Sequence, residues 1–371
     1  MFLAFREIRR AIVRFALLAV AIGLLLFLVL FQQSLQQGLV TSFVGAIRNQ
    51  SAPVLVYGID AQRALQGSVL TPELEAQVLA VDGIGEHARL GETTVSAQID
   101  GQDDDTEASV IGTDGALGQP RELTDGRRPE AANEAVGSSV DFTVGDTVTV
   151  LGVGETVAIT VVGVADEVQL SVSPTLFTDF ATFEAVVRAS NPDAASVPAS
   201  ALAIAPADGV DPQEMADRIN ETVGAADAVT RAEAADTAPG VAQVRQSFQV
   251  IFALYALVVQ LVTGLFFLIV TLQKARALVL LRAIGARTGA LVRALVTQVL
   301  AITGAGIVIG AALTLPLAGQ QVGGLTLRFE NRTLVVWAVA FLVLAVLGAL
   351  VSLLRVRRVD PVEAVVAGGA A

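Results

Sequence analysis

Four long runs of apolar residues dominate the pattern of hydrophobic and polar positions along the chain. None of them has Asp, Glu or Lys in its interior, and they occupy residues 15–31, 250–272, 291–317 and 334–354. An α-helix needs roughly 20 apolar residues to cross about 30 Å of hydrocarbon, so the pattern predicts four transmembrane helices. The amides Gln260 and Gln298 are the main polar exceptions. We expect them to bond across helix interfaces, with the lining of a substrate path as the alternative.

The helical spacing of apolar residues continues beyond the first run, from Leu35 to Ile47, which predicts that the first helix leaves the membrane as a stalk. The segment 241–248 approaches the second run in the same way and predicts a second stalk. Basic residues precede the first run, as in a signal peptide. The run is too long for a signal-peptide core and no cleavage pattern follows it, so we expect the first helix to be retained.

The residues between the first two runs, 41–246, predict a folded domain of mixed secondary structure. Two helices are predicted from their start signals, Thr71 followed by Pro72 and Asp211 followed by Pro212. Strands are predicted at residues 54–58, 109–112, 146–151 and 156–164. The predicted fold class is therefore an α-helical membrane protein with four transmembrane helices and an α+β extracytoplasmic domain inserted between helices 1 and 2.

Charge distinguishes the two sides of the membrane. Twelve of the 24 basic residues lie in the N-terminal segment, in the loop between the second and third helices, and in the tail. Cytoplasmic loops have an excess of Lys and Arg, so this side is predicted to be cytoplasmic. Residues 41–246 have 10 basic and 32 acidic side chains, a net charge of −22. A domain this acidic repels nucleic acid, and we expect a solvated extracytoplasmic body that does not bind it.

These patterns predict a multi-pass protein of the cell membrane with nine segments. They are a cytoplasmic amphipathic segment (1–14), the first helix and stalk (15–40), the extracytoplasmic domain (41–246), the second helix (247–272), a cytoplasmic coupling loop (273–290), the third helix (291–317), an extracytoplasmic loop (318–333), the fourth helix (334–354) and a cytoplasmic tail (355–371).

The sequence has none of the residue patterns of an enzyme site. Its only lysine, Lys274, lies between Gln and Ala, which excludes an ATP-binding P-loop. His87 is the only histidine and there is no cysteine, which excludes histidine-paired triads, multi-histidine metal cages and thiolate chemistry. His87 is expected at the surface or in a turn, and Asp103, Asp104 and Asp105 in a solvated turn rather than a calcium loop. We predict no catalytic residue, no metal and no cofactor.

Small residues interrupt the third apolar run at Gly304, Gly306 and Gly310. Small residues let two membrane helices approach closely, so these glycines predict a helix-packing face. The spelling GAGIVIG has a superficial likeness to a dinucleotide fingerprint, but that fingerprint requires a strand and a helix at a sheet edge, and it has no meaning inside a membrane helix.

The loop between the second and third helices contains the sequence LRAIGA, at residues 281–286. This motif resembles the signature of the FtsX/MacB-type permeases of ABC transporters. The tail segment RVRRVDPVEAV, the N-terminal FREIRRAIVRFALLA and the domain segment GRRPEAANEAVGSS are also similar to that family. Many members have Glu-x-Gly before the LRA motif, where this chain has Ala277 and Val279, so it is closer to the DevC and haem-exporter branch than to MacB itself.

The resemblance implies a permease subunit that forms a homodimer in the membrane lipid and receives ABC ATPase subunits on its cytoplasmic face, where the partner binds ATP. The expected ATPase-docking residues are Lys274, Arg276, Leu281, Arg282, Ile284, Gly285, Ala286 and Arg287. The implied function is export or extraction of an amphipathic substrate, haem or a lipid-like molecule, by mechanotransmission through the stalks. The alternative is a family member that does not transport and instead regulates a cell-wall hydrolase or a sensor.

Overall fold

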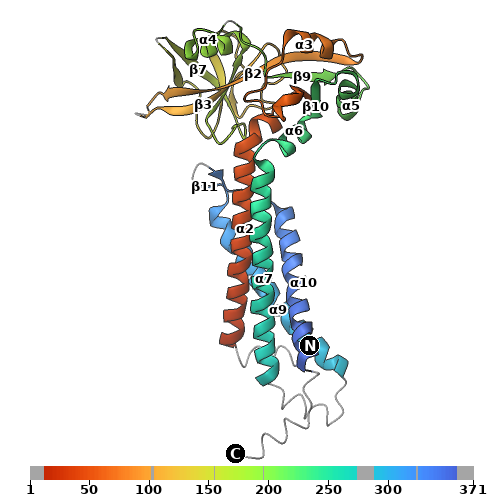
Figure 1. Cartoon of the computed structure of the whole chain (residues 1–371). Helices are drawn as coiled ribbons and strands as arrows, with labels where there is room; N and C mark the ends of the chain where they lie inside the picture. The colour runs from red at the N-terminus through yellow and green to blue at the C-terminus, as the bar shows by residue number, and fades with distance from the viewer. Residues whose placement is uncertain are drawn as a thin grey trace, which may run out of the picture. The chain divides into compact units, whose positions relative to one another are not determined.

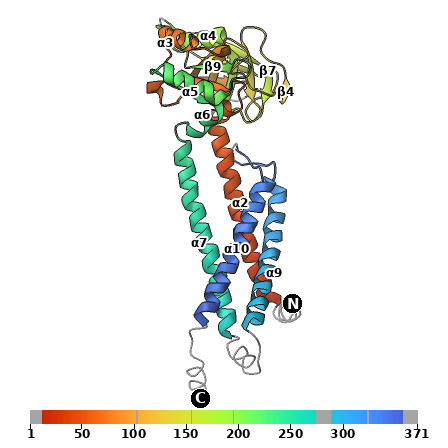
Figure 2. The same cartoon turned by 90° about the vertical axis from the view of Figure 1, so that its right-hand side faces the viewer.

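The computed structural model describes residues 12–101, 104–153, 155–194, 196–273, 288–322 and 325–356. The chain forms two compact units. The first, which we call the membrane unit, comprises Met1–Gly38 and Gln246–Ala371, and the second, the α/β domain, comprises Leu39–Arg245. Figures 1 and 2 show the elements of both units. The division falls inside two long helices, so each of these helices contributes residues to both units.

Four long helices make up most of the described membrane unit: α2 (Ile12–Arg48), α7 (Val241–Gln273), α9 (Thr288–Thr314) and α10 (Asn331–Val356). Each is long and apolar enough to cross a membrane, which confirms the four predicted membrane helices. α2 continues as a helix to Arg48 and α7 begins at Val241, so both segments predicted as stalks are helical; that they leave the membrane stays a prediction.

The third membrane helix ends before the apolar run that predicted it. α9 stops at Thr314, and Leu315–Leu317 form the short 3-10 helix η2. Pro316 explains this end, because proline has no N–H to donate and its ring clashes with the preceding turn of an α-helix. The hairpin of β11 (Gln321–Val322) and β12 (Leu325–Thr326) then leads toward α10, which lies beside α9 (Figure 2).

The helices of the membrane unit bury an apolar core and leave other apolar side chains outside it. Ile22, Leu26 and Phe341 are fully buried in this core. Phe252 of α7 packs on Trp337 of α10, with ring centroids 5.4 Å apart. Large exposed side chains line the other faces of the same helices, as expected for a bundle whose solvent is lipid.

The α/β domain is built on one ten-stranded sheet with the order β10-β1-β9-β2-β3-β8-β5-β7-β4, in which β6 pairs with β2 and β7. The strands are β1 (Val54–Gly58), β2 (Ile84–Ile99), β3 (Thr106–Thr113), β4 (Asp125–Gly126), β5 (Glu134–Ser138), β6 (Thr147–Leu151), β7 (Thr156–Ala165), β8 (Thr175–Asp179), β9 (Ala201–Pro206) and β10 (Ala226–Thr230). Among the described strands, only the pairs β3 with β8 and β5 with β7 are parallel. The four predicted strands are all present.

Four α-helices and a 3-10 turn, η1 (Ile59–Ala61), accompany the sheet: α3 (Pro72–Leu79), α4 (Phe180–Ser190), α5 (Pro212–Thr222) and α6 (Arg231–Thr237). Both predicted helix starts are confirmed. The Thr71 hydroxyl accepts from the Leu74 N–H at 3.3 Å, and the Asp211 carboxylate accepts from the Gln213 N–H at 2.9 Å. These side chains satisfy backbone donors that a helix start leaves without partners.

The core of the α/β domain includes the ends of both stalks. Val40 and Val44 of α2 and Val241 of α7 are buried in the same cluster as Leu55 of β1 and Phe177 of β8. A second cluster fills the space between the sheet and α4, and a third lies under α3 and α5. The domain therefore folds around the stalk ends rather than being attached to them by a flexible linker.

One local expectation is wrong. His87 is predicted at the surface or in a turn of the loop-like segment GIGEHARLG, but this segment forms the beginning of β2. A β-bulge lies between Ile84 and His87, which pairs with Ile204 of β9. Glycine is common at bulges, where a strand needs extra freedom, and this accounts for a strand in a glycine-rich segment. His87 is exposed, as predicted.

Candidate functional site

The predicted helix-packing glycines bring α9 against α2. A Cβ atom on Gly306 would lie 2.8 Å from Ile22 Cγ2 and 2.9 Å from the Ala19 carbonyl oxygen. A Cβ atom on Gly310 would lie 2.7 Å from the carbonyl oxygen of Gly23, which in turn faces the Gly306 carbonyl. Each contact involves backbone atoms, so the two helices approach as closely as they do only because these residues lack side chains.

Gly304 differs from the other two glycines, because no atom lies within 4 Å of where its Cβ would be. The structure thus places Gly306 and Gly310, but not Gly304, at a helix contact. The contact is within one chain. Gly306 and Gly310 therefore pack α9 on α2 of the same chain.

The two amides within the membrane helices have different surroundings. Turned to satisfy both of its neighbours, the Gln260 amide donates to the Leu344 carbonyl at 2.9 Å and accepts from the Gly348 N–H at 3.2 Å, which joins α7 to α10. Gln298 of α9 is buried, and its Nε2 has no hydrogen-bond partner in the described part of the chain. Gln260 therefore bonds across a helix interface, as expected for these amides.

The residues expected to dock the ATPase, Lys274, Arg276, Leu281, Arg282, Ile284, Gly285, Ala286 and Arg287, lie outside the described residues. The helices on both sides of them are described. α7 ends at Gln273 and α9 begins at Thr288, so the sequence between these positions connects the end of one membrane helix to the start of the next.

The α2 stalk is interrupted at Val44, where the backbone has φ −133° and ψ 15° instead of helical values. Here the loop after β7 replaces helix hydrogen bonds. The N–H of Ser171 donates to the Phe43 carbonyl at 3.0 Å, and the Ala46 N–H donates to the Gln169 carbonyl at 3.0 Å. Gly45 is required at this point, because its Cβ would lie 2.3 Å from the Glu167 carbonyl oxygen. The stalk is thus bonded into the domain by its backbone.

A single carboxylate joins the ends of the two stalks. Asp236 Oδ1, on α6, accepts from Arg48 Nη2 at 3.0 Å and from Arg245 Nη2 at 2.6 Å. Arg48 is the last residue of α2, and Arg245 lies in the first turns of α7. All three side chains are partly exposed, so each ion pair contributes only about 0.2–1 kcal/mol to stability. The two ion pairs mainly fix the positions of the stalk ends, because both arginines bind the same oxygen of α6.

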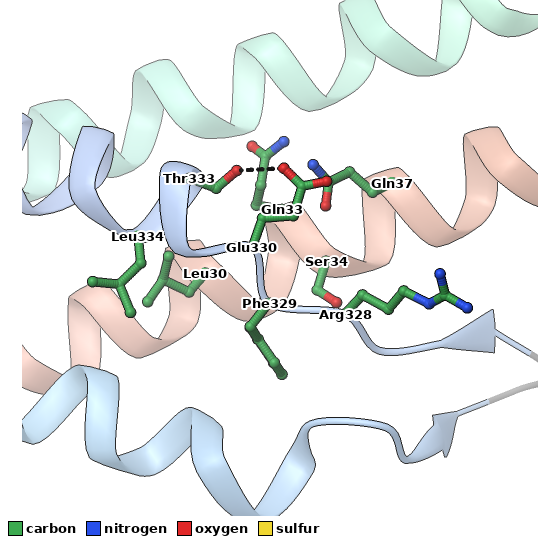
Figure 3. Close-up of a pocket in the computed structure, with 9 residues that line it drawn as sticks. All are labelled: Leu30, Gln33, Ser34, Gln37, Arg328, Phe329, Glu330, Thr333 and Leu334. Carbon is green, nitrogen blue, oxygen red and sulfur yellow. Dashed lines mark hydrogen bonds between the residues drawn. The ribbon is translucent and has the colours of Figure 1, made fainter.

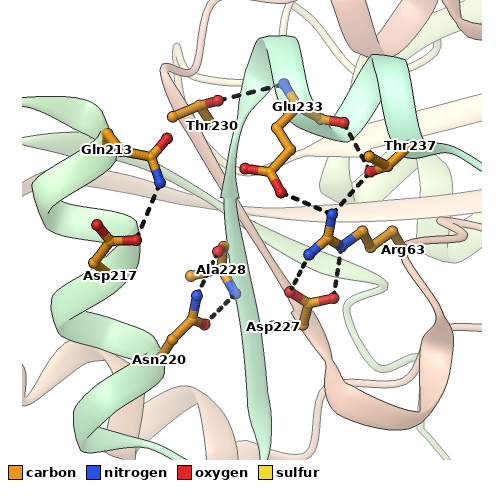
Figure 4. A network of polar contacts seen from close by, with 9 residues as sticks. All are labelled: Arg63, Gln213, Asp217, Asn220, Asp227, Ala228, Thr230, Glu233 and Thr237. Atoms are coloured by element: carbon orange, nitrogen blue, oxygen red, sulfur yellow. Dashed lines mark hydrogen bonds and ion pairs between the residues drawn. The ribbon is translucent and has the colours of Figure 1, made fainter.

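A second ion-pair network fixes α6 itself to the sheet (Figure 4). Arg63 donates to both carboxylate oxygens of Asp227 on β10, at 2.8 and 3.2 Å. Its Nη1 donates to Glu233 Oε1 and to Thr237 Oγ1, each at 2.9 Å. Such bidentate arginine pairs fix orientation as well as distance. α6 is therefore a rigid piece between the sheet and the stalk ends.

The segment GRRPEAANEAVGSS, which contributes to the family resemblance, includes a turn whose residues hydrogen-bond to one another. Arg127 contacts both carboxylate oxygens of Glu134, which also accepts the backbone N–H groups of Glu130 and Ala131 at 2.9 and 3.1 Å. The hydrogen bond from Arg127, followed by the backbone donors, lowers the pKa of Glu134 to about 2. These residues shape the loop before β5 and are not arranged as a catalytic pair.

Glu92 of β2 is the one buried acid of the described domain whose pKa is strongly raised. Burial of its side chain raises the pKa to about 7, and a hydrogen bond from Thr94 Oγ1 at 3.3 Å opposes this only in part. Its Oε2 has no hydrogen-bond partner in the described part of the chain. Among the described residues, no group of three or more His, Asp or Glu side chains is placed to hold a metal ion.

Sequence reasoning missed the stalk junction, although a signal was present. Arg48 and Arg245 are two of only 10 basic residues in the acidic segment 41–246, and both lie at its ends, where the stalks begin and finish. Two cations at the edges of an acidic domain indicate an acidic partner between them. Which of the 32 acids it is cannot be predicted without the fold, because Asp236 lies 188 residues from Arg48.

Comparisons with known proteins find similar sequences over both the membrane unit and the whole chain. Residues 249–361 match the family model described as the FtsX-like permease C-terminal domain. The chain is 26% identical over 372 residues to the "Putative hemin transport system permease protein HrtB" of Staphylococcus haemolyticus, covering 98% of both chains. A protein of the same name from Staphylococcus epidermidis is 26% identical over 118 residues, 32% of this chain and 33% of that one.

Two crystal structures resemble the domain at low identity. The extracellular domain of the noncanonic ABC-type transporter YknZ from Gram-positive bacteria is 15% identical with a TM-score of 0.32, and covers 48% of this chain and 100% of that one. The periplasmic region of MacB from Actinobacillus actinomycetemcomitans is 12% identical with a TM-score of 0.35, and covers 53% and 96%. Through residues 249–361 the chain is thus similar to the FtsX-like permeases, and over nearly its whole length it is similar to a protein named as a transport permease.

Proposed function

We propose that this permease transmits movement, driven by ATP hydrolysis in a separate ATPase subunit, through its two stalks to the α/β domain, and that this movement exports or extracts an amphipathic substrate. The observation that supports the proposal most strongly is the double ion pair of Asp236 with Arg48 and Arg245, which ties the ends of both stalks to one helix. A domain held by two stalks at one point cannot remain still when either stalk moves.

The substrate class is proposed from chemistry and from the relatives. The described chain has no arrangement for polar catalysis, and its longest helices present apolar faces, which suits a molecule that partitions into the membrane. The S. haemolyticus relative that matches over nearly its whole length is named as a hemin transport permease. Hemin is therefore the first substrate to test, and lipid-like molecules are the second.

ATPase docking is proposed at the basic loop between α7 and α9. Charge supports it, since Lys274, Arg276, Arg282, Arg287 and Arg293 lie within 272–298 with no acid among them. Replacing both Arg282 and Arg287 with Glu should abolish co-purification of the ATPase subunit while membrane insertion is unchanged. Arg332→Glu, at the start of α10, is the matched control and should retain the ATPase. Normal co-purification with the double variant would contradict docking at this loop.

A homodimer is proposed because α7 leaves a continuous apolar stripe uncovered. Leu254, Leu257, Leu261 and Leu265 follow one face at helical spacing and are 55, 60, 61 and 52% exposed. One four-helix bundle encloses little space for a substrate, whereas two copies frame a cavity between them. The mass of the chain with its ATPase in a lipid nanodisc should correspond to two permease copies. A particle with one permease copy that still hydrolyses ATP in response to substrate would contradict the dimer.

Transmission through the stalks is tested by locking them together. Val40 of α2 and Val244 of α7 both pack in the cluster at the stalk ends, and the chain has no cysteine of its own. Oxidised Val40→Cys/Val244→Cys protein should hydrolyse ATP without transporting hemin, and reduction should restore transport. Each single cysteine variant is the control. Normal hemin transport by fully cross-linked protein would contradict the mechanism.

A further inference from the structure

A pocket in the membrane unit lies between α2 and the segment that leads into α10 (Figure 3). Gln33, Ser34 and Gln37 line it from α2, and Arg328 and Glu330 line it from the other side. The pocket has about 230 Å³ of empty space and is partly open to the surroundings.

The pocket lies where the apolar part of α2 ends. The run of apolar residues in α2 stops at Phe31, and the next residues of the helix are amides. Leu30, Phe329 and Leu334 are its apolar lining residues, and its polar residues on α2 follow Leu30 along the helix. A helix changes from apolar to polar residues where it passes from the hydrocarbon into the head-group region. The pocket is therefore at the depth of lipid head groups.

One side chain of the pocket indicates that a ligand atom binds there, and a second supplies a charge. Ser34 is only 2% exposed, and its hydroxyl has no hydrogen-bond partner in the described part of the chain. A buried hydroxyl is normally paired, because leaving it without a partner costs the hydrogen bonds it makes to water. The Glu330 carboxylate accepts from Thr333 Oγ1 at 3.4 Å, and Figure 3 shows it beside the amides of Gln33 and Gln37.

The polar groups that line the pocket include several acceptors and one carboxylate. The Glu330 carboxylate, the Ser34 hydroxyl and the side-chain oxygens of Gln33 and Gln37 together suit a primary ammonium, which has three N–H donors and no acceptor. A trimethylammonium has no N–H and cannot donate to these acceptors. Arg328 adds a guanidinium, the side chain best matched to phosphate.

We propose that this pocket binds the head group of a phosphatidylethanolamine-type lipid of the surrounding bilayer. The ammonium is held by Glu330 and the α2 side chains, the phosphate lies against Arg328, and an acyl chain runs along Leu30 and Leu334. This proposal does not depend on the proposed transport function. It gives α2, at the base of its stalk, a contact that varies with the lipid composition of the membrane.

The experiment measures lipid retention by the full-length chain. Native mass spectrometry in detergent, with equal amounts of ethanolamine, monomethyl-ethanolamine, dimethyl-ethanolamine, choline and glycerol phospholipids that share one pair of acyl chains, should show one retained ethanolamine lipid. Retention should fall with each added methyl group, by about tenfold between the first and the last. Equal retention of the ethanolamine, choline and glycerol lipids by the unmodified chain would overturn the proposal.

The variants assign the selectivity to the pocket. Glu330→Gln and Ser34→Ala should each remove most of the preference for ethanolamine over choline, and Glu122→Gln, an exposed acid of the α/β domain, should leave it unchanged. A preference that persists in Glu330→Gln would overturn the assignment. Soluble phosphoethanolamine at the same concentration separates the two sources of this head group. Displacement of the retained lipid by the soluble compound would contradict a bilayer lipid as the ligand, and no displacement supports it.

Discussion

A Cβ atom on Gly310 would lie 2.7 Å from the carbonyl oxygen of Gly23, so the backbones of α9 and α2 are in direct contact at this point. α9 begins immediately after the loop proposed to dock the ATPase, and α2 continues beyond Gly23 as the first stalk. A backbone contact transmits displacement with little slack, because no side chain can rotate to absorb it. In the proposed mechanism, this contact passes a displacement of α9 directly to α2.

Replacing Gly310 with Ala should destabilise the membrane unit by about 1–3 kcal/mol, because overpacking forces a backbone shift that outweighs the gain in helix propensity. Trp337 is the only tryptophan of the chain and packs on Phe252, so its fluorescence reports unfolding of the bundle in detergent. The control is Gly304→Ala, since nothing lies within 4 Å of that Cβ position. Equal stability of the two variants would argue against a tight α2–α9 contact.

Removing the charge of Asp236 should loosen the stalk junction more than it lowers stability. Asp236→Asn loses two partly exposed ion pairs, so the free energy of unfolding should fall by no more than about 2 kcal/mol. Hydrogen exchange should rise at the end of α2 and the start of α7, near Arg48 and Arg245. The exposed Asp208→Asn serves as the control. Unchanged exchange at both stalk ends would show that the carboxylate does not hold them.

Glu92 should make the stability of the α/β domain depend on pH. Burial raises the pKa of Glu92 to about 7 from the ordinary value of 4.5, so the folded domain holds this proton more tightly than the unfolded chain does. Stability is then greatest below pH 4.5 and falls as the pH rises to about 7, by roughly 3 kcal/mol at most. Glu92→Gln should remove this slope and be more stable than the wild type above pH 7.

The pH slope is measured with the full-length chain by pulse proteolysis in urea, which follows cleavage of the domain at pH 5 and pH 7.5. Glu134→Gln provides a contrast, because the pKa of Glu134 is lowered to about 2 and its contribution is constant over this range. A wild type whose urea midpoint is the same at both pH values would mean that Glu92 is stabilised in its charged form by groups outside the described chain.

Topology can be checked directly, because the chain has no cysteine. A cysteine in place of Asp104, an exposed residue of the α/β domain, should react with an impermeant maleimide on intact cells. A cysteine in place of Arg287, in the basic loop, should react only after the cells are opened. The reverse pattern would invert the orientation predicted from the distribution of Lys and Arg.

The membrane helices were predictable because a bilayer imposes a length and a composition that the sequence must show at each crossing. The stalks followed from apolar spacing that continues past Phe31, and the starts of α3 and α5 from Thr71 and Asp211. These signals are local, since each is contained in a few neighbouring residues.

The stalk junction and the pocket depend on pairs of residues that are distant in the sequence. Asp236 with Arg48, Arg63 with Asp227 and Ser34 beside Glu330 are brought together only by the fold. The sheet order, in which β9 lies between β1 and β2, also has no local signal. The glycines of α9 illustrate the limit well. The small size of these glycines indicates a helix contact. Gly304 is a glycine like Gly306 and Gly310, but no described atom lies within 4 Å of its Cβ position.

The central claim is that events at the ATPase move the α/β domain. Spin labels on Asp208→Cys, in the domain, and Leu313→Cys, on α9, report the distance between the two units by pulsed electron resonance. Dilution with unlabelled chains restricts the signal to one chain. With the ATPase subunit present, adding ATP should shift the distance distribution, and the Arg282→Glu/Arg287→Glu variant should show no shift. Identical distributions with and without ATP, in a sample that is hydrolysing ATP, would contradict transmission through the stalks.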